Sequence, residues 1–192
     1  MKTYKDIHGW FDWEQLYDHI ANQMKDGWVH VEVGVWQGKS VCYLADKLKK
    51  LNKKCKIYAV DWFKGSIDEP ELLEIANENG GSVLSIFKQN LKDLELEDIV
   101  IPVESDSAEA ADMFEDEGLP SVYIDANHSY EGVTRDLEAW WPKVAKGGSI
   151  FGHDIAEEQV MRAVYHFNYR VDKHMKVHRI HPNNFGMQKA NP

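Results

Sequence analysis

Acidic side chains follow apolar runs at several separate places in this 192-residue chain. The acids that directly end or follow such runs are Glu32, Asp61, Asp125 and Asp154. Carboxylates bind cations, accept hydrogen bonds from hydroxyl groups and move protons. Buried carboxylates are unfavourable without partners, so this pattern predicts a ligand that supplies positive charge, hydroxyl groups or a metal ion.

The apolar runs alternate with helical patterns along the chain. The predicted strands cover residues 28–33, 55–63, 98–105, 120–128 and 147–155. They are continuous apolar runs, which is typical of a parallel sheet covered by helices on both faces. Ligands of such α/β sheets bind beyond the carboxyl ends of the strands, so we expect the acids to face one crevice.

Helical spacing of apolar residues places helices between these strands. The predicted helices cover residues 11–24, 40–51, 82–91, 107–117, 130–145 and 156–168. Residues 66–81 contain Pro70 and end in two glycines. Two alternatives stay open for this segment: a mobile lid or an irregular short helix. Trp140 and Trp141 are expected in the core or at an interface.

The same sequence patterns predict the structure of the C-terminal tail and the number of domains. Residues 174–191 predict two short strands around a turn at 181–184. No repeat or linker divides the chain, so we expect a single domain over residues 1–192. Within it, residues 1–27 would form an N-terminal helical cap on a core of residues 28–192.

Composition restricts the class of partner. The formal net charge is -10 and the pI is about 5.3, which disfavours nucleic acid and anionic membranes. No apolar run approaches the roughly 20 residues of a membrane span, and the first residues lack a signal-peptide pattern. Cys42 and Cys55 are too few for a disulfide framework. We expect a cytoplasmic protein with a small-molecule partner, and a homodimer is left open.

The stretch "VEVGVWQGKS", residues 31–40, places a loop between a strand and a helix. Its G-x-x-x-G spacing matches neither the dinucleotide fingerprint nor the phosphate-binding loop, and Glu32 would repel a diphosphate. Asp61 ends the second strand, where an acid can bind a ribose diol. The pattern therefore favours a positively charged nucleoside without phosphates, and S-adenosylmethionine is such a molecule.

Longer motifs carry a family resemblance. "VEVGVWQGKS" and "YAVDWF" resemble the first two motifs of class I S-adenosylmethionine-dependent methyltransferases. "IDANHSYEGVTRDLEAWWPKVAKGGSIFGHD" resembles methyltransferase family 24, the macrocin O-methyltransferase and cephalosporin-hydroxylase-like group. The resemblance covers about residues 28–155. It implies a Rossmann-like class I methyltransferase fold, with a seven-stranded, mostly parallel sheet of order 3-2-1-4-5-7-6 and an antiparallel strand near residues 185–189.

The resemblance also implies a cofactor site. The loop after the first strand would hold the methionine part of S-adenosylmethionine, with Glu32 either anchoring the loop or contacting the cofactor. Asp61 is expected at the ribose and Trp62 against adenine, although ordinary packing stays open for Trp62. The residues expected to bind the cofactor are Glu32, Gly34, Trp36, Gly38, Ser40, Asp61, Trp62, Ser105, Asp106 and Asp125.

Methyl transfer to a hydroxyl group also requires loss of a proton, to a base or with the help of a cation. The candidate catalytic residues are His128, Asp125 and His153. Asp125 and Asp154 stand where metal-dependent O-methyltransferases of similar fold place metal-binding acids. Oxygen ligands of this kind suit Mg²⁺. The usual third ligand is replaced by Ile155. Asn127, His128 or His153 would then complete the site, and an imidazole ligand would make Mn²⁺ an alternative to Mg²⁺.

We therefore predict an S-adenosylmethionine-dependent methyltransferase that acts on a small-molecule hydroxyl with assistance from a divalent metal. Two alternatives stay open: a catalytically inactive cofactor-binding protein of the same fold, and a nucleotide- or NAD-binding Rossmann enzyme. No convincing spacing for a 2-His-1-carboxylate iron site is present. The acceptor pocket is expected from the N-terminal segment, the insert at residues 65–81 and the tail.

Overall fold

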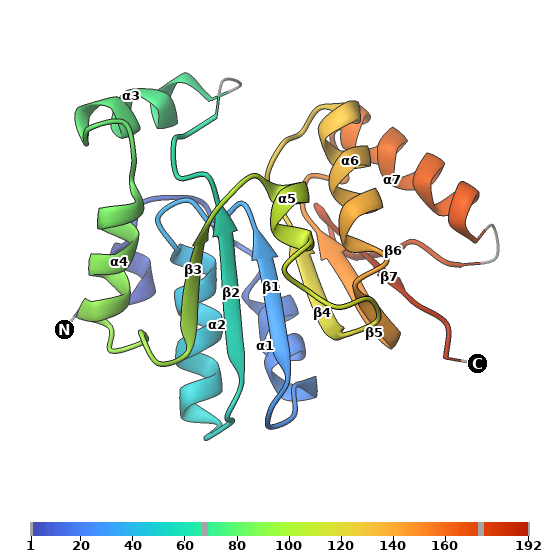
Figure 1. Cartoon of the computed structure of the whole chain (residues 1–192), viewed down its shortest axis with the longest axis horizontal. Coiled ribbons are helices and arrows are strands. Elements are labelled where there is room, and N and C mark those ends of the chain that lie inside the picture. Colours follow the sequence, from blue (N-terminus) through green and yellow to red (C-terminus); the bar gives the residue numbers. More distant parts are fainter. Residues whose placement is uncertain (1, 67–68, 173–174, 192) are drawn as a thin grey trace.

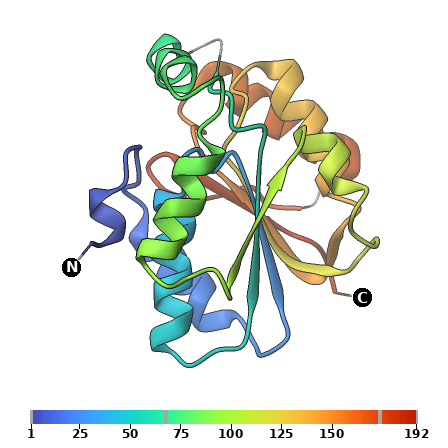
Figure 2. The same cartoon turned by 60° about the vertical axis from the view of Figure 1, so that its left-hand side comes forward.

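The computed structural model describes residues 2–66, 69–172 and 175–191. In this part of the chain a seven-stranded sheet lies between two layers of helices (Figure 1 and Figure 2). The strand order is β3-β2-β1-β4-β5-β7-β6. This order confirms the α/β prediction and the topology that the resemblance implied.

The strands are short, and most of them are parallel. Their bounds are β1 (Val29–Val33), β2 (Lys56–Asp61), β3 (Val100–Glu104), β4 (Leu119–Ile124), β5 (Val144–Gly152), β6 (His178–His181) and β7 (Asn184–Gln188). The first five strands pair in parallel, whereas β7 is antiparallel to both β5 and β6. The predicted tail hairpin and the antiparallel strand near its end are therefore confirmed.

The helices follow the predicted alternation. Their bounds are α1 (Glu14–Gln23), α2 (Lys39–Lys50), α3 (Pro70–Glu78), α4 (Leu84–Asp93), α5 (Ser107–Ala111), α6 (Tyr130–Trp140) and α7 (Glu158–Val171), with a short 3₁₀ turn at Tyr4–Asp6. None of the helices in the described ranges combines the length and apolar character that a membrane crossing needs.

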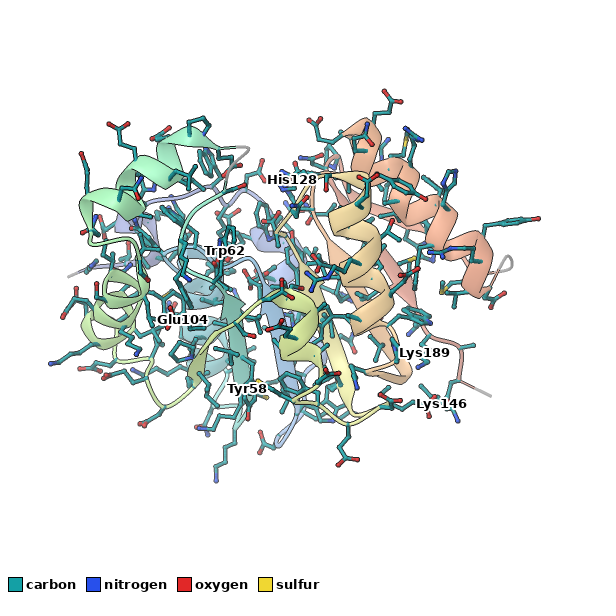
Figure 3. All side chains as sticks on the ribbon, turned by 45° about the horizontal axis from the view of Figure 1, so that its top comes forward. Tyr58, Trp62, Glu104, His128, Lys146 and Lys189 are labelled. Carbon is teal, nitrogen blue, oxygen red and sulfur yellow. The ribbon has the colours of Figure 1, made fainter. Side chains whose placement is uncertain are left out.

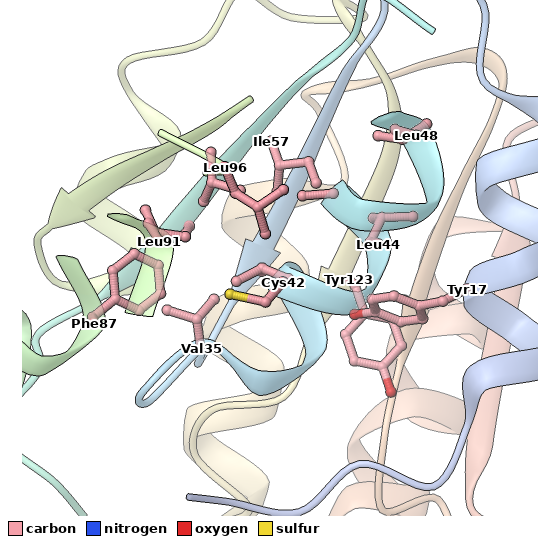
Figure 4. Close-up of a cluster of buried hydrophobic side chains, with 14 of the residues drawn as sticks. Tyr17, Val35, Cys42, Leu44, Leu48, Ile57, Phe87, Leu91, Leu96 and Tyr123 are labelled. Atoms are coloured by element: carbon pink, nitrogen blue, oxygen red, sulfur yellow. The ribbon is translucent and has the colours of Figure 1, made fainter. Parts of the chain in front are cut away.

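Two hydrophobic clusters bury the two faces of the sheet, which explains why its strands are continuous apolar runs. One cluster joins α1, α2 and α4 to side chains such as Ile57 of β2 (Figure 4). The other joins α5, α6 and α7 to side chains such as Val31 of β1. Trp140 and Trp141 are buried in this second cluster, so they belong to the core.

Most element bounds differ by a few residues from the sequence predictions, and three differences have a clear structural reason or consequence. The insert forms the regular helix α3, with Pro70 in its first turn, where a missing N–H costs nothing. α5 ends at Ala111 instead of residue 117, because the chain then turns and brings Phe114 against Tyr58 and Trp140. β5 begins at Val144 and ends at Gly152, which leaves the two residues that follow beyond the strand.

Gly34 sets the distance between the loop after β1 and the end of β4. Its φ is +84°, a left-handed conformation that side chains rarely adopt. A Cβ atom built there would lie 1.9 Å from the backbone oxygen of Asp125. Only glycine therefore lets the loop after β1 reach the residues that follow β4.

The Gly34→Ala substitution is expected to lower the free energy of unfolding by about 3 kcal/mol or more, because it adds a backbone clash to the left-handed conformation. Gly80→Ala is the matched control. Gly80 has φ +76° and no atom within 4 Å of a built Cβ, so its loss should be about 1 kcal/mol. Urea denaturation of both variants measures the difference, and equal losses would contradict the close approach.

Candidate active site

A cavity of about 1250 Å³ lies beyond the carboxyl ends of the parallel strands. It is larger than the roughly 300–1,000 Å³ of a typical ligand pocket, which leaves room for a cofactor and a second molecule. Figure 3 shows Trp62 and His128 at this end of the sheet. The predicted site residues that line the cavity are Gly34, Trp36, Ser40, Asp61, Trp62, Ser105, Asp106, Asp125, His128, His153 and Asp154.

Glu32 lies behind the cavity wall, almost fully buried at the end of β1. Its carboxyl group accepts a hydrogen bond from Tyr17 of α1 at 2.6 Å and a second from Ser40 of α2. Burial raises the pKa of Glu32 to about 8, and the nearby charge of Asp125 acts in the same direction. Of the two roles predicted for Glu32, these contacts favour the anchoring of the loop.

Gly38 differs from its predicted role beside the ligand. Its φ is +91°, and a built Cβ would lie 2.7 Å from the ring of Phe87 on α4. The missing side chain therefore makes room for Phe87, and Gly38 does not line the cavity. Trp36, between the two glycines, has a left-handed φ of +49° and does line the cavity.

Asp61 connects the loop after β1 to the loop after β2. One carboxylate oxygen accepts the backbone N–H of Trp36 at 2.8 Å, and the other accepts that of Phe63 at 2.6 Å. Burial raises the pKa of Asp61, while these N–H groups oppose the shift. The next residue, Trp62, is 48% exposed, and its indole N–H donates to Gly65 at 2.6 Å.

Asp106 begins α5 and is already paired. It accepts the backbone N–H groups of Ala108 and Glu109, and both of its oxygens lie 2.7 Å from the guanidinium of Arg135. This ion pair holds the pKa of Asp106 below its usual range. Next to Arg135, the buried Asp136 also lines the cavity, and burial raises its pKa to about 6.

The sequence prediction missed Arg135 and Asp136. Together with Gly132 they lie one helical turn apart on α6, on the side that faces the cavity. That spacing was the available signal, because residues at i, i+3 and i+4 share a helix face.

Asp125, His128 and Asp154 form the one group of potential metal ligands found among the described residues. One ligand atom from each lies within 4.8 Å of the others. His128 Nε2 is 3.1 Å from Asp154 Oδ2 and 3.8 Å from Asp125 Oδ1. Without a bound cation, the carboxylates of Asp125 and Asp154 raise the pKa of His128 to about 9. With this pKa His128 would be mostly protonated near neutral pH, so without a cation it would be a poor base for an acceptor hydroxyl.

His153 borders the same group. Its Nδ1 lies 3.1 Å from Asp154 Oδ2, and its ring lies against Trp13 with 4.2 Å between ring centroids. Burial acts to lower the pKa of His153, but Asp154 and Asp125 raise it overall. Ile155, at the position of the usual third ligand, is buried in the hydrophobic core.

The N-terminal segment forms a further wall of the cavity through residues 8–13, as expected for an acceptor pocket. Two side chains of the loop region hold it: Trp36 donates to His8 at 3.2 Å, and Lys39 donates to the carbonyl of Gly9 at 2.8 Å. The insert contributes Gly65, Ser66, Glu69 and Leu72 to the wall of the cavity. No described residue of the tail lines the cavity, so that part of the expectation is wrong.

Comparisons with known proteins agree on the fold. A family model for a methyltransferase domain matches residues 31–155. The O-methyltransferase NovP is similar with a TM-score of 0.69 and 20% identity, over 93% of this chain and 78% of that one. A Clostridium thermocellum protein named as an rRNA methylase has a TM-score of 0.67 and 17% identity, over 100% and 98%. A Streptococcus mutans protein named as a methyltransferase, in complex with S-adenosylhomocysteine, has a TM-score of 0.65 and 11% identity, over 95% and 99%.

The buried Glu32 predicts a pH-dependent stability. The pKa of Glu32, about 8, exceeds the ordinary value of 4.5. The contribution of its proton to the free energy of unfolding is therefore complete below about pH 4.5 and is lost as the pH rises to about 8. Since glutamine does not titrate, the stability advantage of the native protein over Glu32→Gln should shrink between pH 5 and 8. The expected slope is at most about 1.4 kcal/mol per pH unit.

Urea denaturation at a series of pH values measures this advantage. Glu97→Gln, at an exposed position after α4, is the control for loss of a carboxyl group. A constant difference between the native protein and Glu32→Gln over this range would rule out a proton on Glu32.

Proposed function

The chain belongs to methyltransferase family 24, a family of S-adenosylmethionine-dependent methyltransferases, and on this premise we propose that it methylates a hydroxyl group of a small molecule with the help of a divalent cation. The observation that carries the proposal is the position of Asp125. This residue belongs to the group of potential metal ligands, and its backbone lies against Gly34 in the cofactor loop. Cofactor and cation would therefore bind side by side.

The acidic lining and the volume of the cavity support S-adenosylmethionine as its ligand. Asp61 would accept from the ribose hydroxyls, Trp62 offers an exposed ring for adenine, and Ser105 with Asp106 borders that end. Asp136 adds a second acid there. When bound, S-adenosylmethionine supplies a methyl group already activated by its sulfonium. The residues of this chain would hold it in line with the acceptor and exclude water.

Basic side chains on the cavity wall are occupied, which disfavours a diphosphate ligand such as NAD. Arg135 is paired with Asp106, and the amino group of Lys39 is bound to the carbonyl of Gly9. The wall around them is rich in carboxylates. A ligand with a sulfonium and an ammonium group matches this wall better than a nucleotide does.

The group formed by Asp125, His128 and Asp154 fits a divalent cation. Two ligands at right angles on an ion, each about 2.1 Å from it, lie about 3 Å apart, and opposite ligands about 4.2 Å apart. The 3.1 Å from His128 Nε2 to Asp154 Oδ2 is close to the first value, and the 3.8 Å to Asp125 Oδ1 lies between the two values. The cation would lower the pKa of the acceptor hydroxyl. Two carboxylates suit Mg²⁺, and the imidazole favours Mn²⁺.

The other candidates for the third ligand are less well placed. The side-chain oxygen of Asn127 accepts the backbone N–H of Ser129 at 2.8 Å, so it completes its own turn. His153 contacts Asp154 but stands outside the group of three. We assign His153 to the acceptor side, where its ring borders Trp13. It would take up the proton of the acceptor once a bound cation offsets the carboxylates that raise its pKa.

A second candidate function is RNA methylation, which the name of the Clostridium thermocellum relative suggests. Two features of this chain oppose it. The net charge is -10, and carboxylates dominate the cavity wall, whereas RNA binding requires Lys and Arg to neutralise phosphates. The intact group of metal ligands opposes an inactive cofactor-binding protein.

Transfer of an isotope-labelled methyl group tests the function directly. The protein, S-adenosylmethionine labelled in its methyl group and Mn²⁺ or Mg²⁺ are incubated with a small-molecule extract or with total RNA. We expect label in low-mass products as O-methyl groups, identified by mass spectrometry. EDTA should abolish the transfer, either ion should restore it, and Asp154→Ala should stay inactive with the ion present. Label found in RNA, or transfer insensitive to EDTA, would contradict the proposal.

Asp61→Ala is expected to weaken S-adenosylhomocysteine binding at least tenfold. The substitution removes a charged acceptor whose hydrogen bonds are worth about 1.5–3 kcal/mol each, and about 1.4 kcal/mol corresponds to tenfold. Isothermal titration calorimetry measures the change. Asp46→Ala on α2, which loses a surface pair with Lys50, is the matched control and should bind normally. Equal affinity in the two variants would remove Asp61 from the cofactor site.

A further inference from the structure

We propose that Asn183, in the turn between β6 and β7, is a positioning residue that holds Asp154 in its metal-binding orientation. The proposal rests on the cation site proposed above. Asn183 lies outside the cavity wall and beyond residues 31–155, to which the family match extends. Neither the cavity nor the family match therefore draws attention to it.

Asn183 makes three hydrogen bonds to consecutive residues after β5. Its side-chain Nδ2 donates to Asp154 Oδ1 at 2.8 Å. Its side-chain Oδ1 accepts the backbone N–H of Ala156 at 3.2 Å. Its backbone oxygen accepts the N–H of Ile155, also at 3.2 Å. One residue of the hairpin thus fixes both the backbone and the side chain of the segment that carries Asp154.

The bond to Oδ1 determines which oxygen of Asp154 faces the cation site. Because Oδ1 is held by the amide of Asn183, Oδ2 is the oxygen that lies 3.1 Å from His128 Nε2. Hydrogen bonds of this kind fix the orientation of carboxylate ligands, and their loss typically weakens metal binding. Asn183 itself is a poor ligand, since its Oδ1 is already used by Ala156.

The backbone of Asp154 has an uncommon conformation that hydrogen bonds to the segment help to hold. Its φ is +56°, in the left-handed region that residues with a side chain adopt less readily than glycine does. Asn183 is not among the residues with positive φ, so the common reason for asparagine in a turn does not apply to it. The feature of asparagine that matters here is that its side-chain amide both donates and accepts a hydrogen bond.

The hairpin is well fixed, so it can serve as a support. β7 pairs with β5 in the sheet, with Ile150 opposite Met187. The next residue after Asn183, Asn184, is fully buried and accepts the hydroxyl of Tyr123 at 2.6 Å. Tyr123 lies on β4, two residues before Asp125. The hairpin is thereby tied to both strands that lead into the cation site.

Binding of Mn²⁺ alone tests the proposal without an acceptor substrate. Electron paramagnetic resonance of free Mn²⁺ gives the dissociation constant for the native protein, Asn183→Ala and Asn183→Leu. Leucine has the same number and branching of side-chain heavy atoms but makes no hydrogen bonds. Both variants should bind Mn²⁺ about 10–100-fold more weakly. Their affinity for S-adenosylhomocysteine, measured by calorimetry, should stay within about twofold, because the cofactor loop does not contact Asn183.

Asn22→Ala is the matched control, because it removes an exposed asparagine side chain near the end of α1. It should leave both affinities unchanged. Unchanged Mn²⁺ affinity in both Asn183 variants would refute the positioning role and leave the cation site intact. Loss of both Mn²⁺ and S-adenosylhomocysteine binding would give Asn183 a general structural role and also refute the proposal. If the native protein binds no Mn²⁺, the cation part of the proposed function fails as well, while S-adenosylhomocysteine binding still reports on the cofactor part.

Discussion

The carboxylates that gather at the carboxyl ends of the parallel strands repel one another. Each of them therefore needs a partner that offsets its negative charge, and these partners determine much of the structure of the site. Asp106 is paired with Arg135, and Asp61 accepts two backbone N–H groups. Glu32 accepts two hydroxyl groups and has a raised pKa, which favours its neutral form. Asp125 and Asp154 differ from these three. Their neighbours are two imidazoles, and their spacing suits a shared cation. The remaining demand for positive charge at this end of the sheet is what a sulfonium cofactor would meet.

Close backbone packing brings these groups together. Gly34 allows the loop after β1 to lie against the residue that follows β4, and Asp61 joins the same loop to the chain after β2. The N-terminal segment is in turn held by Trp36 and Lys39. Cofactor loop, proposed cation site and acceptor wall therefore form one connected structure. A substitution that breaks any of these three connections, at Gly34, at Asp61 or at the N-terminal segment, is expected to affect the binding of more than one ligand.

Much of this arrangement could be predicted from the sequence, because it depends on where strands end. Apolar runs predicted the sheet, and Asp61, Asp125 and Asp154 were placed correctly in one cavity, whereas Glu32 lies behind its wall. The missing features depend on tertiary contacts. Gly38 makes room for Phe87, which is distant in sequence. The spacing on α6 shows that Asp136 shares a face with Gly132, but not that this face docks toward the cavity. Asn183 reaches Asp154 through the pairing of β7 with β5, which no local pattern reveals. The division into a cap and a core stays a prediction.

We propose that the methyl donor and the cation bind side by side, because Gly34 in the cofactor loop contacts the backbone of Asp125. Nuclear magnetic resonance of S-adenosylmethionine carrying a ¹³C-methyl group, bound to the protein, tests this with Mn²⁺ as a paramagnetic probe. Mn²⁺ should strongly broaden the methyl signal, and Asp154→Ala should abolish the broadening while the cofactor remains bound. An unbroadened methyl signal in the native protein, with both Mn²⁺ and cofactor bound, would contradict the proposal.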